Sequence, residues 1–302
     1  MKYVIVSTAV TDETYQYGTT APTVSLGGAG TYGLVGAKIW TDDVALVTGV
    51  GADFVETHGA WFETNRLHTQ HLIVKDEHTP KTLVKYFEDG ERQETPAYGA
   101  EHYRSMEASA ADIGEALRPG VKGIYIFKEA ELAFWDEIDA LKQKFGFKLM
   151  WEINADSADY ALISTVRQIA ERVDMFSINR TEAQSLLRKD NVEEIIAEFA
   201  AWDTPLVFLR DGARGAFMIS GEEVVHAPVV PDLDVIDATG GGNSSSAGVL
   251  FGICEGYSPY EAGIIGSISA SICLRQEGVP LRLNEGLRQD AIELLNKMRE
   301  EN

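Results

Sequence analysis

The sequence predicts an α/β protein in which a central, mostly parallel sheet is flanked by helices and carries a small β lid. Two observations predict this class. Short β-branched or aromatic runs alternate with helix-length runs through the second half of the 302-residue chain, which is typical of parallel strands joined by helical crossovers. The 45% hydrophobic content is enough for a buried core. Because no repeat, low-complexity tract or linker interrupts the chain, a single domain over residues 3–299 is favoured.

The strands and helices are bounded by turn residues and by changes in hydrophobic period. Apolar β-branched runs predict strands, and the longer runs that end at Gly256, Gly278 and Pro280 predict helices. The expected strands span residues 3–9, 44–50, 123–127, 148–153, 174–178 and 205–209, followed by a hairpin of 215–220 and 223–227. The expected helices span residues 31–40, 130–145, 158–171, 181–188, 244–255, 259–276 and 285–299, and a charged helical stretch ends at residue 117.

The lid is expected from two polar segments that interrupt this alternation. Residues 14–23 are rich in threonine, and residues 83–98 predict an exposed hairpin that turns at Asp89 and Gly90. An exposed hairpin leaves strand edges open, so the lid is a candidate surface for a homodimer.

Charge and cysteine content exclude several kinds of protein. The chain has 47 acidic and 26 basic residues, a formal net charge of −21, which argues against nucleic acid or an anionic membrane as a partner. Its two cysteines, Cys254 and Cys273, lie in apolar stretches, so neither a disulfide framework nor a cysteine-based zinc site is expected. The first ten residues lack a leader pattern, and charges interrupt every stretch long enough to span a membrane. A cytoplasmic protein is expected.

The strongest local motif is Asp-Ala-Thr-Gly-Gly-Gly-Asn-Ser-Ser-Ser at residues 237–246, directly before a predicted helix. Glycines let backbone amides approach a ligand, and the helix start adds unpaired N–H groups and a positive dipole end. Together they predict an anion-binding site, with phosphate as the expected ligand. The alternative is a turn that only caps the helix through Asn243 or Ser244.

This segment resembles the C-terminal signature of the ribokinase/PfkB family of sugar and nucleoside kinases, Asp-Thr-x-Gly-Ala-Gly-Asp. Asp237, Gly240 and Gly242 are identical to it, and Gly241 stands for alanine. Further landmarks follow in the family's order over about residues 3–285: a first strand with Asp12, the glycines of 27–30, a strand at 48–53, Asn-x-x-Glu at 179–182 and a Gly-x-x-Gly hairpin at 211–215.

The resemblance implies a ribokinase-like fold and ATP-dependent phosphoryl transfer to a hydroxyl of a sugar, nucleoside or related small polyol, with ATP and Mg²⁺ bound. The implied catalytic residues are Gly240, Gly241, Gly242 and Asn243. The implied acceptor-binding residues are Asp12, Gly27, Gly28, Tyr32 and Glu129. The implied nucleotide-binding residues are Asn179, Arg210, Gly212, Gly215, Asp237, Gly240 and Gly242, and the implied metal-binding residues are Asn179 and Glu182.

Three positions depart from the family pattern. Asn243 stands where active members have an aspartate that accepts the proton of the attacking hydroxyl, and an amide has no such state near pH 7. Loss of a general base commonly costs about 10²- to 10⁴-fold, although phosphoryl transfer depends mainly on positioning and charge. The departures therefore leave two alternatives, a working kinase and a pseudokinase that only binds. Tyr32 replaces a substrate-binding asparagine, and Arg210 replaces a threonine.

Asn179 and Glu182 lie three residues apart, which places both on one face of the first turn of a helix. They form a capping pair on the structural interpretation. On the functional interpretation they contact Mg²⁺ through water. The two roles are compatible.

A competing motif is the Gly28-x-Gly30-x-x-Gly33 run, which fits the dinucleotide fingerprint and has Asp53 about 20 residues on. It makes an NAD(P)-binding oxidoreductase the less favoured alternative, because residues 3–9 already supply the first strand. The three histidines at 68, 71 and 78 are interpreted as solvated or half-buried side chains and not as metal ligands.

Overall fold

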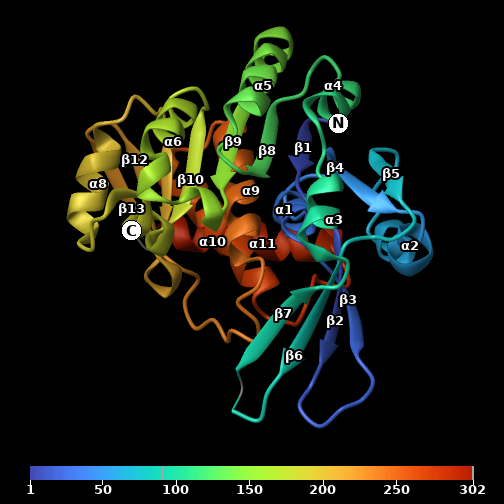
Figure 1. Cartoon of the computed structure of the whole chain (residues 1–302). Coiled ribbons are helices and arrows are strands. Elements are labelled where there is room, and N and C mark those ends of the chain that lie inside the picture. Colours follow the sequence, from blue (N-terminus) through green and yellow to red (C-terminus); the bar gives the residue numbers. More distant parts are fainter. Residues whose placement is uncertain (90, 301–302) are drawn as a thin grey trace.

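The computed structural model describes residues 1–89 and 91–300. Within these ranges the main sheet has nine strands in the order β13-β12-β11-β10-β9-β8-β1-β4-β5 (Figure 1). The strands from β11 to β5 run parallel, and β12 and β13 add an antiparallel edge. The strands are β1 Tyr3–Val6, β4 Val44–Gly51, β5 Leu72–Asp76, β8 Gly123–Lys128, β9 Lys148–Ile153, β10 Met175–Asn179, β11 Val207–Arg210, β12 Ala216–Ser220 and β13 Glu223–Ala227. The predicted fold class is confirmed.

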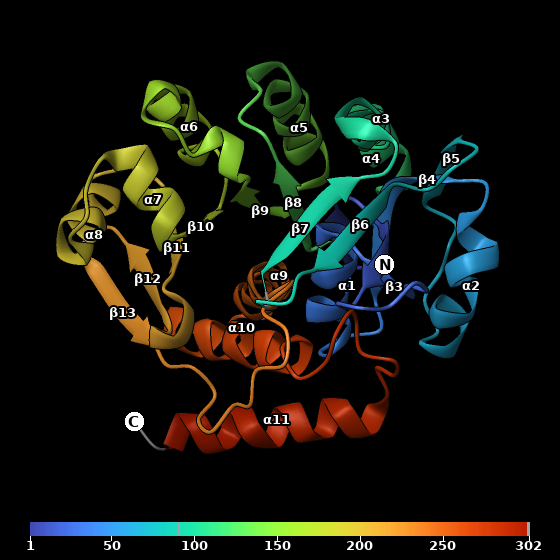
Figure 2. The same ribbon diagram turned by 60° about the horizontal axis from the view of Figure 1, so that its bottom comes forward.

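Helices cover both faces of this sheet, as Figure 2 shows. Alternate residues of β1 point into two separate cores: Tyr3 and Ile5 into one, Val4 and Val6 into the other. The first core is covered by α1 Ala29–Lys38, α2 Phe54–Thr64, α9 Gly241–Cys254, α10 Pro259–Cys273 and α11 Glu285–Glu300. The second is covered by α4 Ala110–Ala116, α5 Leu132–Phe145, α6 Ile163–Ala170, α7 Arg180–Leu187 and α8 Val192–Ala200.

Small residues let α1, α9 and α10 approach closely. A Cβ on Gly36 of α1 would overlap the backbone of Ser244 in α9, and a Cβ on Gly248 of α9 would lie 2.5 Å from Oγ of Ser269 in α10. Glycine is required at these contacts because any side chain would push the helices apart. This packing brings the start of α9 against α1.

The predicted lid is a four-stranded sheet in the order β3-β2-β6-β7, which projects below the main sheet in Figure 1. Its strands are β2 Val10–Tyr15, β3 Thr23–Gly27, β6 Lys81–Tyr86 and β7 Arg92–Pro96. The predicted lid segment 14–23 was therefore too short, because pairing of Val10 with Gly27 already begins the small sheet. For the same reason the first strand ends at Val6. The predicted 83–98 hairpin is confirmed by β6 and β7, and Gly90 lies outside the described residues.

Several elements differ from the sequence prediction. The helix α2, the edge strand β5 and the helix α8 were not predicted, and the charged stretch divides into α3 Gly99–Ser105 and α4. The helix predicted at 158–171 begins as a 3₁₀ turn, because the Asp159 side chain accepts from the Ala161 amide before α6 starts. Most consequential, α9 begins at Gly241, three residues before the predicted start.

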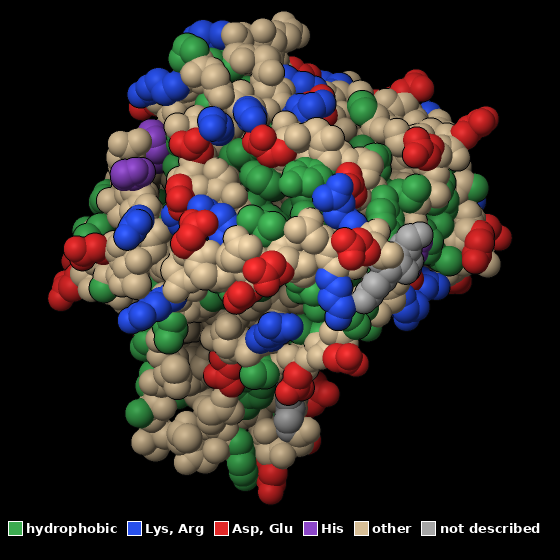
Figure 3. Space-filling model, turned by 180° about the vertical axis from the view of Figure 1, so that it is seen from behind, with side chains coloured by type: hydrophobic (Ala, Val, Ile, Leu, Met, Phe, Trp, Pro, Cys, Tyr) green, Lys and Arg blue, Asp and Glu red, His purple; other side chains and the backbone are tan. Residues whose placement is uncertain are grey.

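The charged side chains fit a solvated surface. Figure 3 shows acidic side chains scattered among lysines and arginines on the rear face. In the described ranges no helix is both long and apolar enough to cross a membrane. Cys254 and Cys273 are free thiols.

Candidate active site

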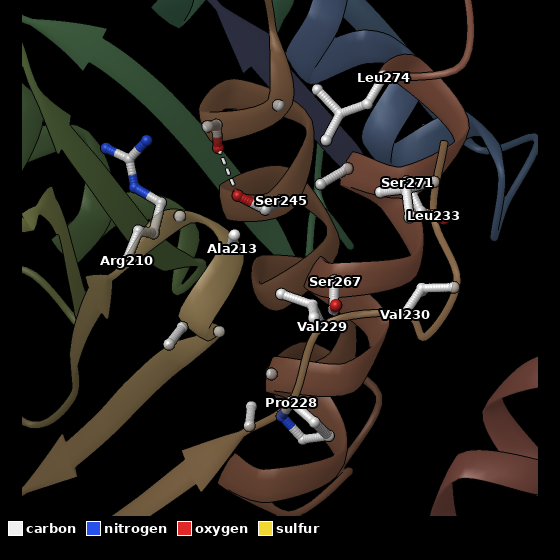
Figure 4. Close-up of a pocket in the computed structure, with 18 of the residues that line it drawn as sticks. Arg210, Ala213, Pro228, Val229, Val230, Leu233, Ser245, Ser267, Ser271 and Leu274 are labelled. Carbon is white, nitrogen blue, oxygen red and sulfur yellow. Dashed lines mark hydrogen bonds between the residues drawn. The ribbon is translucent and has the colours of Figure 1, made fainter. Parts of the chain in front are cut away.

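A cavity of about 690 Å³ lies between the end of the sheet and the helices α9 and α10. Figure 4 shows Arg210 and Ala213 on its strand side, with Ser245, Ser267, Ser271 and Leu274 on its helix side. Its wall is largely apolar and includes Phe208, Val229, Val230, Leu233 and Leu274. Six of the predicted residues line it: Asn179, Arg210, Gly212, Gly215, Gly241 and Gly242.

A second cavity, of about 410 Å³, lies between the small sheet and the starts of α1 and α9. It is lined by four predicted residues: Asp12, Gly28, Tyr32 and Asp237. The carboxylate of Asp12 packs over Gly27, where a Cβ would overlap it. The remaining wall is rich in polar side chains, among them Thr14, Thr82, Tyr86, Glu94, Tyr103, Thr239 and Glu277.

Glu129 is the predicted site residue that the structure does not bring to the others. It follows β8, and its carbonyl oxygen accepts a hydrogen bond from Nε1 of Trp135. It lines neither of the two cavities.

The glycine turn separates the two cavities. Asp237 accepts hydrogen bonds from the backbone amide and the hydroxyl of Thr239, and Gly240 then adopts a left-handed conformation with φ of 77° as the N-cap of α9. The first amides of a helix have no partner within the helix. In the described part of the chain, no side chain caps the start of α9, so those amides can bind an anion. The hydroxyl groups of Ser244 and Ser245 donate back to the carbonyl oxygens of Gly240 and Gly242.

Two residues predicted from separate motifs meet at this turn. The ring of Tyr32, in the first turn of α1, lies against Gly240, where a Cβ would overlap ring carbons Cγ and Cδ1. Tyr32 is only 3% exposed. The ring therefore forms the wall of the smaller cavity next to the start of α9.

Asn243 is anchored beneath the turn by two side chains that the sequence did not indicate. Its Nδ2 donates to the hydroxyl of Tyr125, at 3.1 Å, and to Oε1 of Glu152, at 3.2 Å. The Tyr125 hydroxyl in turn donates to Oε2 of Glu152 at 2.9 Å. Burial raises the pKa of Tyr125 well above its usual value, and the Glu152 charge adds to this effect. Tyr125 therefore stays a neutral hydrogen-bond donor.

Arg210 lies between Glu152 and the glycine turn. Its Nη2 is 3.1 Å from Oε1 of Glu152 and 3.7 Å from Oε2 of Glu182. A Cβ on Gly242 would overlap Nη1 of Arg210, so the absence of a side chain there admits the guanidinium. Among the described residues, the buried Nε and Nη2 atoms of Arg210 have no acceptor in hydrogen-bond geometry, so Arg210 and Glu152 form an ion pair that is not an aligned hydrogen bond.

The Asn179 and Glu182 pair forms the predicted capping box at the start of α7. The Asn179 side chain accepts from the Glu182 amide at 2.9 Å, and Glu182 accepts from the Asn179 amide at 2.8 Å. Burial raises the pKa of Glu182, and the nearby Arg210 charge opposes this shift. The structural interpretation is thus confirmed, and the magnesium role stays a prediction.

The following turn is held by its own ion pairs. Asp211 accepts from Arg214 at 2.9 Å and from Arg180 at 3.2 Å. Hydrogen bonds from Arg214 lower the pKa of Asp211. These bonds fix the turn that carries Gly212 and Gly215 into the larger cavity.

Of the two site residues that the sequence analysis missed, Tyr125 and Glu152, one has an unusual sequence context. Glu152 is a charged residue within the otherwise apolar strand run Leu-Met-Trp-Glu-Ile, and lone charges are rarely buried without a partner. The partners of Glu152 come from β8, β11 and α9, which are distant from it in the sequence, so the sequence could not identify them.

Metal binding by protein side chains alone is not supported. In residues 1–89 and 91–300 no group of three or more His, Cys, Asp or Glu side chains is arranged to hold an ion. Mg²⁺ is often bound by one or two carboxylates together with substrate phosphates and water. Glu182, which is close to Arg210 and the larger cavity, fits that kind of site.

These features define the class of protein, which has a ribokinase-like α/β fold with a glycine turn between two cavities. The chain belongs to the pfkB family of carbohydrate kinases, whose family model matches residues 7–284. An ATP-dependent 6-phosphofructokinase of Thermoanaerobacterium thermosaccharolyticum is 26% identical over 130 residues, which are 43% of this chain and 38% of that enzyme.

Solved structures share the fold over nearly the whole chain. A probable sugar kinase from Rhizobium etli has a TM-score of 0.78 at 19% identity and covers 97% of this chain and 98% of its own. Aminoimidazole riboside kinase from Salmonella enterica, solved with aminoimidazole riboside and an ATP analog, has a TM-score of 0.76 at 16% identity, covering 98% and 100%.

The structure argues against the NAD(P)-binding oxidoreductase alternative. The glycines at 28, 30 and 33 follow β3, which pairs antiparallel with β2 in the small sheet. A dinucleotide fingerprint requires a preceding strand of the parallel sheet.

Proposed function

We propose that the protein transfers the γ-phosphoryl group of ATP to a hydroxyl of a sugar, nucleoside or related small polyol. The observation that carries this proposal is the position of the glycine turn. The start of α9, with its open amides, lies between an apolar cavity and a polar one. Such a turn stabilises the negative charge that develops on a phosphoryl group between two bound molecules.

ATP is proposed to occupy the larger cavity. Its apolar wall suits a nucleobase, and Arg210 lines the end of the cavity nearest to the turn. A guanidinium favours phosphate, because it offers several N–H donors and a positive charge. Asn179, Gly212 and Gly215 would contact the nucleotide. Magnesium, when bound, supplies positive charge to the phosphates, and Glu182 would hold it through water.

The acceptor is proposed to occupy the smaller cavity. Asp12 would accept hydrogen bonds from its hydroxyls, as would Asp237 and Glu94, which line the same wall. A wall of carboxylates and hydroxyls suits a polyol more than an apolar molecule. Tyr32 limits the size of the group that reaches the glycine turn.

Asn243 is proposed to orient the attacking hydroxyl. The acceptor oxygen forms a bond to the γ-phosphorus as the bond to the β–γ bridging oxygen breaks, ADP leaves, and the hydroxyl proton passes to water. The amides of Gly241, Gly242 and Asn243 stabilise the charge on the transferred group. Slow turnover is expected because no general base is provided at position 243.

A pseudokinase is the second candidate. The observation that favours it is the combination of Asn243 with the Tyr32 ring packed against Gly240. In that case the same cavities bind nucleotide or polyol without transfer.

The deciding experiment measures ADP formation with ATP and Mg²⁺ against a panel of sugars, nucleosides and polyols, together with thermal stabilisation by each ligand. Acceptor-dependent ADP formation supports the kinase. Stabilisation by ATP and Mg²⁺ without any ADP formation supports the pseudokinase. Stabilisation by NAD but not by ATP contradicts both.

A homodimer through the small sheet is also proposed. Its edge strands are β3 and β7, and Val24 on β3 is 52% exposed. Unpaired edges pair readily with a second copy. Light scattering after size exclusion tests this, with Val24→Lys expected to shift the protein toward monomer.

A further inference from the structure

Side chains from three strands of the main sheet converge beneath the glycine turn. Tyr125 comes from β8, Glu152 from β9 and Arg210 from β11. The strand β10 lies between β9 and β11, and the side chain of Asn179 at its end caps α7. The register places Glu152 opposite Ser177 of β10 and Phe127 of β8. The order of the strands thus delivers one buried carboxylate to the underside of α9.

Glu152 occupies a defined position relative to the turn. Its side chain is 3% exposed, and Oε1 lies 3.4 Å from where a Cβ of Gly242 would stand. It accepts hydrogen bonds from Tyr125 and Asn243 and faces Arg210. A buried carboxylate requires such compensation.

We propose that Glu152 positions Asn243 and supplies the negative charge that the signature would otherwise carry at position 243. Both N–H groups of the Asn243 amide are used by Tyr125 and Glu152. Its Oδ1 is therefore left as the acceptor for the attacking hydroxyl. Glu152 is a positioning residue, because its buried carboxylate acts through its hydrogen bond with Asn243. This inference rests on the proposed phosphoryl transfer.

A direct consequence concerns the substitution Asn243→Asp. It would place a second carboxylate about 3 Å from Glu152 in a buried site, and like charges at that distance cannot both ionise at low cost. Restoring the aspartate is therefore expected to fail while Glu152 is present. It is expected to succeed when residue 152 is neutral.

The test is a double-mutant cycle of Asn243→Asp and Glu152→Gln in the full chain. Two readouts are measured at pH 7.5: steady-state kinetics with the acceptor that gives ADP formation, and the urea midpoint of unfolding. Glu152→Gln is expected to lower kcat about tenfold or more while both KM values change less than about threefold. Asn243→Asp alone is expected to lower the urea midpoint and to raise kcat less than about twofold.

In the Glu152→Gln background, Asn243→Asp is expected to raise kcat at least about tenfold and to leave the urea midpoint unchanged or higher. If Asn243→Asp has the same effect in both backgrounds on both readouts, the inference is overturned. If no variant turns over, phosphoryl transfer fails as a proposal, and the urea midpoints alone decide whether positions 152 and 243 are coupled through charge.

Glu255→Gln is the matched control. Glu255 likewise accepts from a tyrosine, Tyr3, and pairs with a cation, Lys122, at 2.8 Å, but it follows α9 at the far end of the helix. It is expected to lower the urea midpoint without changing kcat. If Glu152→Gln does not fold, Tyr125→Phe replaces it: it removes one of the two anchors of Asn243 and is expected to lower kcat several-fold at constant KM. An unchanged kcat in Tyr125→Phe would then contradict the positioning role.

Discussion

The ring of Tyr32 packs directly on Gly240, so that no side chain at position 240 can be accommodated without moving the ring. Tyr32 belongs to the first turn of α1, and Gly240 is the N-cap of α9. The contact joins the wall of the smaller cavity to the turn that we propose binds phosphate. A substitution at either residue should therefore affect both the smaller cavity and the turn.

Gly240→Ala should disrupt this junction. The substitution meets the Tyr32 ring and also places a side chain at a φ of 77°, which by itself costs about 1–2 kcal/mol. Because of the added clash with the ring, we expect the free energy of unfolding to fall by more than this amount. We also expect the loss of thermal stabilisation by ATP and Mg²⁺. The control is Gly256→Ala, at φ of 85° with no atom within 4 Å of the added Cβ. Equal losses in the two variants would show that the ring contact has no energetic weight.

Tyr32→Ala should change acceptor selection. Truncation of a ring that is 3% exposed is expected to cost about 3–5 kcal/mol of stability and to widen the smaller cavity beside the turn. Larger polyols should gain in kcat/KM relative to small ones in the acceptor panel. Tyr32→Phe, which keeps the ring, should preserve the wild-type ranking. The same ranking in Tyr32→Ala would place the acceptor elsewhere.

Arg210→Met should destabilise the protein. It leaves Glu152 buried without its cation, and breaking a buried ion pair in this way costs about 3–5 kcal/mol. Urea unfolding of Arg210→Met and of Arg210→Met with Glu152→Gln measures this, and the double variant should recover part of the loss. Isothermal titration with ATP should also show weaker binding in both variants. Full ATP affinity in Arg210→Met would remove Arg210 from the nucleotide site.

Nucleotide affinity should depend strongly on magnesium. With a formal net charge of −21, the protein offers ATP few groups that attract anions: the amide donors at the start of α9, Arg210 and the metal ion that we propose binds with the nucleotide. Titration of ATP with Mg²⁺ and then with chelator should show at least about a tenfold difference in affinity. Glu182→Gln should reduce that difference, because a carboxylate in this position favours the ion. Affinity unaffected by chelator would contradict the site assignment.

Stability should fall in mild acid because of His58. Its Nε2 lies 2.8 Å from Oγ1 of Thr11, and burial lowers its pKa to about 4. Neutral His58 makes its full contribution to the free energy of unfolding above the pKa of the unfolded state, near 6.5. That contribution is lost as the pH falls from there toward 4. Urea unfolding from pH 7 to 4 should be flatter in His58→Gln than in wild type. The exposed His68→Gln should keep the wild-type slope.

The sequence predicted most of the regular structure and the location of the glycine turn. Parallel strands buried on both faces are continuous apolar runs, so they stand out, and the three glycines before α9 required no tertiary information. The edge strand β5 was missed, because a half-exposed edge carries a mixed pattern that resembles a loop. The helices α2 and α8 were also missed.

The sequence by itself determined the fold and the family. It also identified the residues of each motif, because the residues of one motif lie within a few positions of one another in the chain. Only the tertiary structure decided which of them meet. Asn243 and Glu152 are 91 residues apart in the chain, and they touch because the strand order sets β9 beside β8 under α9. Tyr32 reaches Gly240 because glycines in α1, α9 and α10 let these helices approach closely. Such contacts depend on the order and spacing of packed elements, which no local pattern of residues encodes.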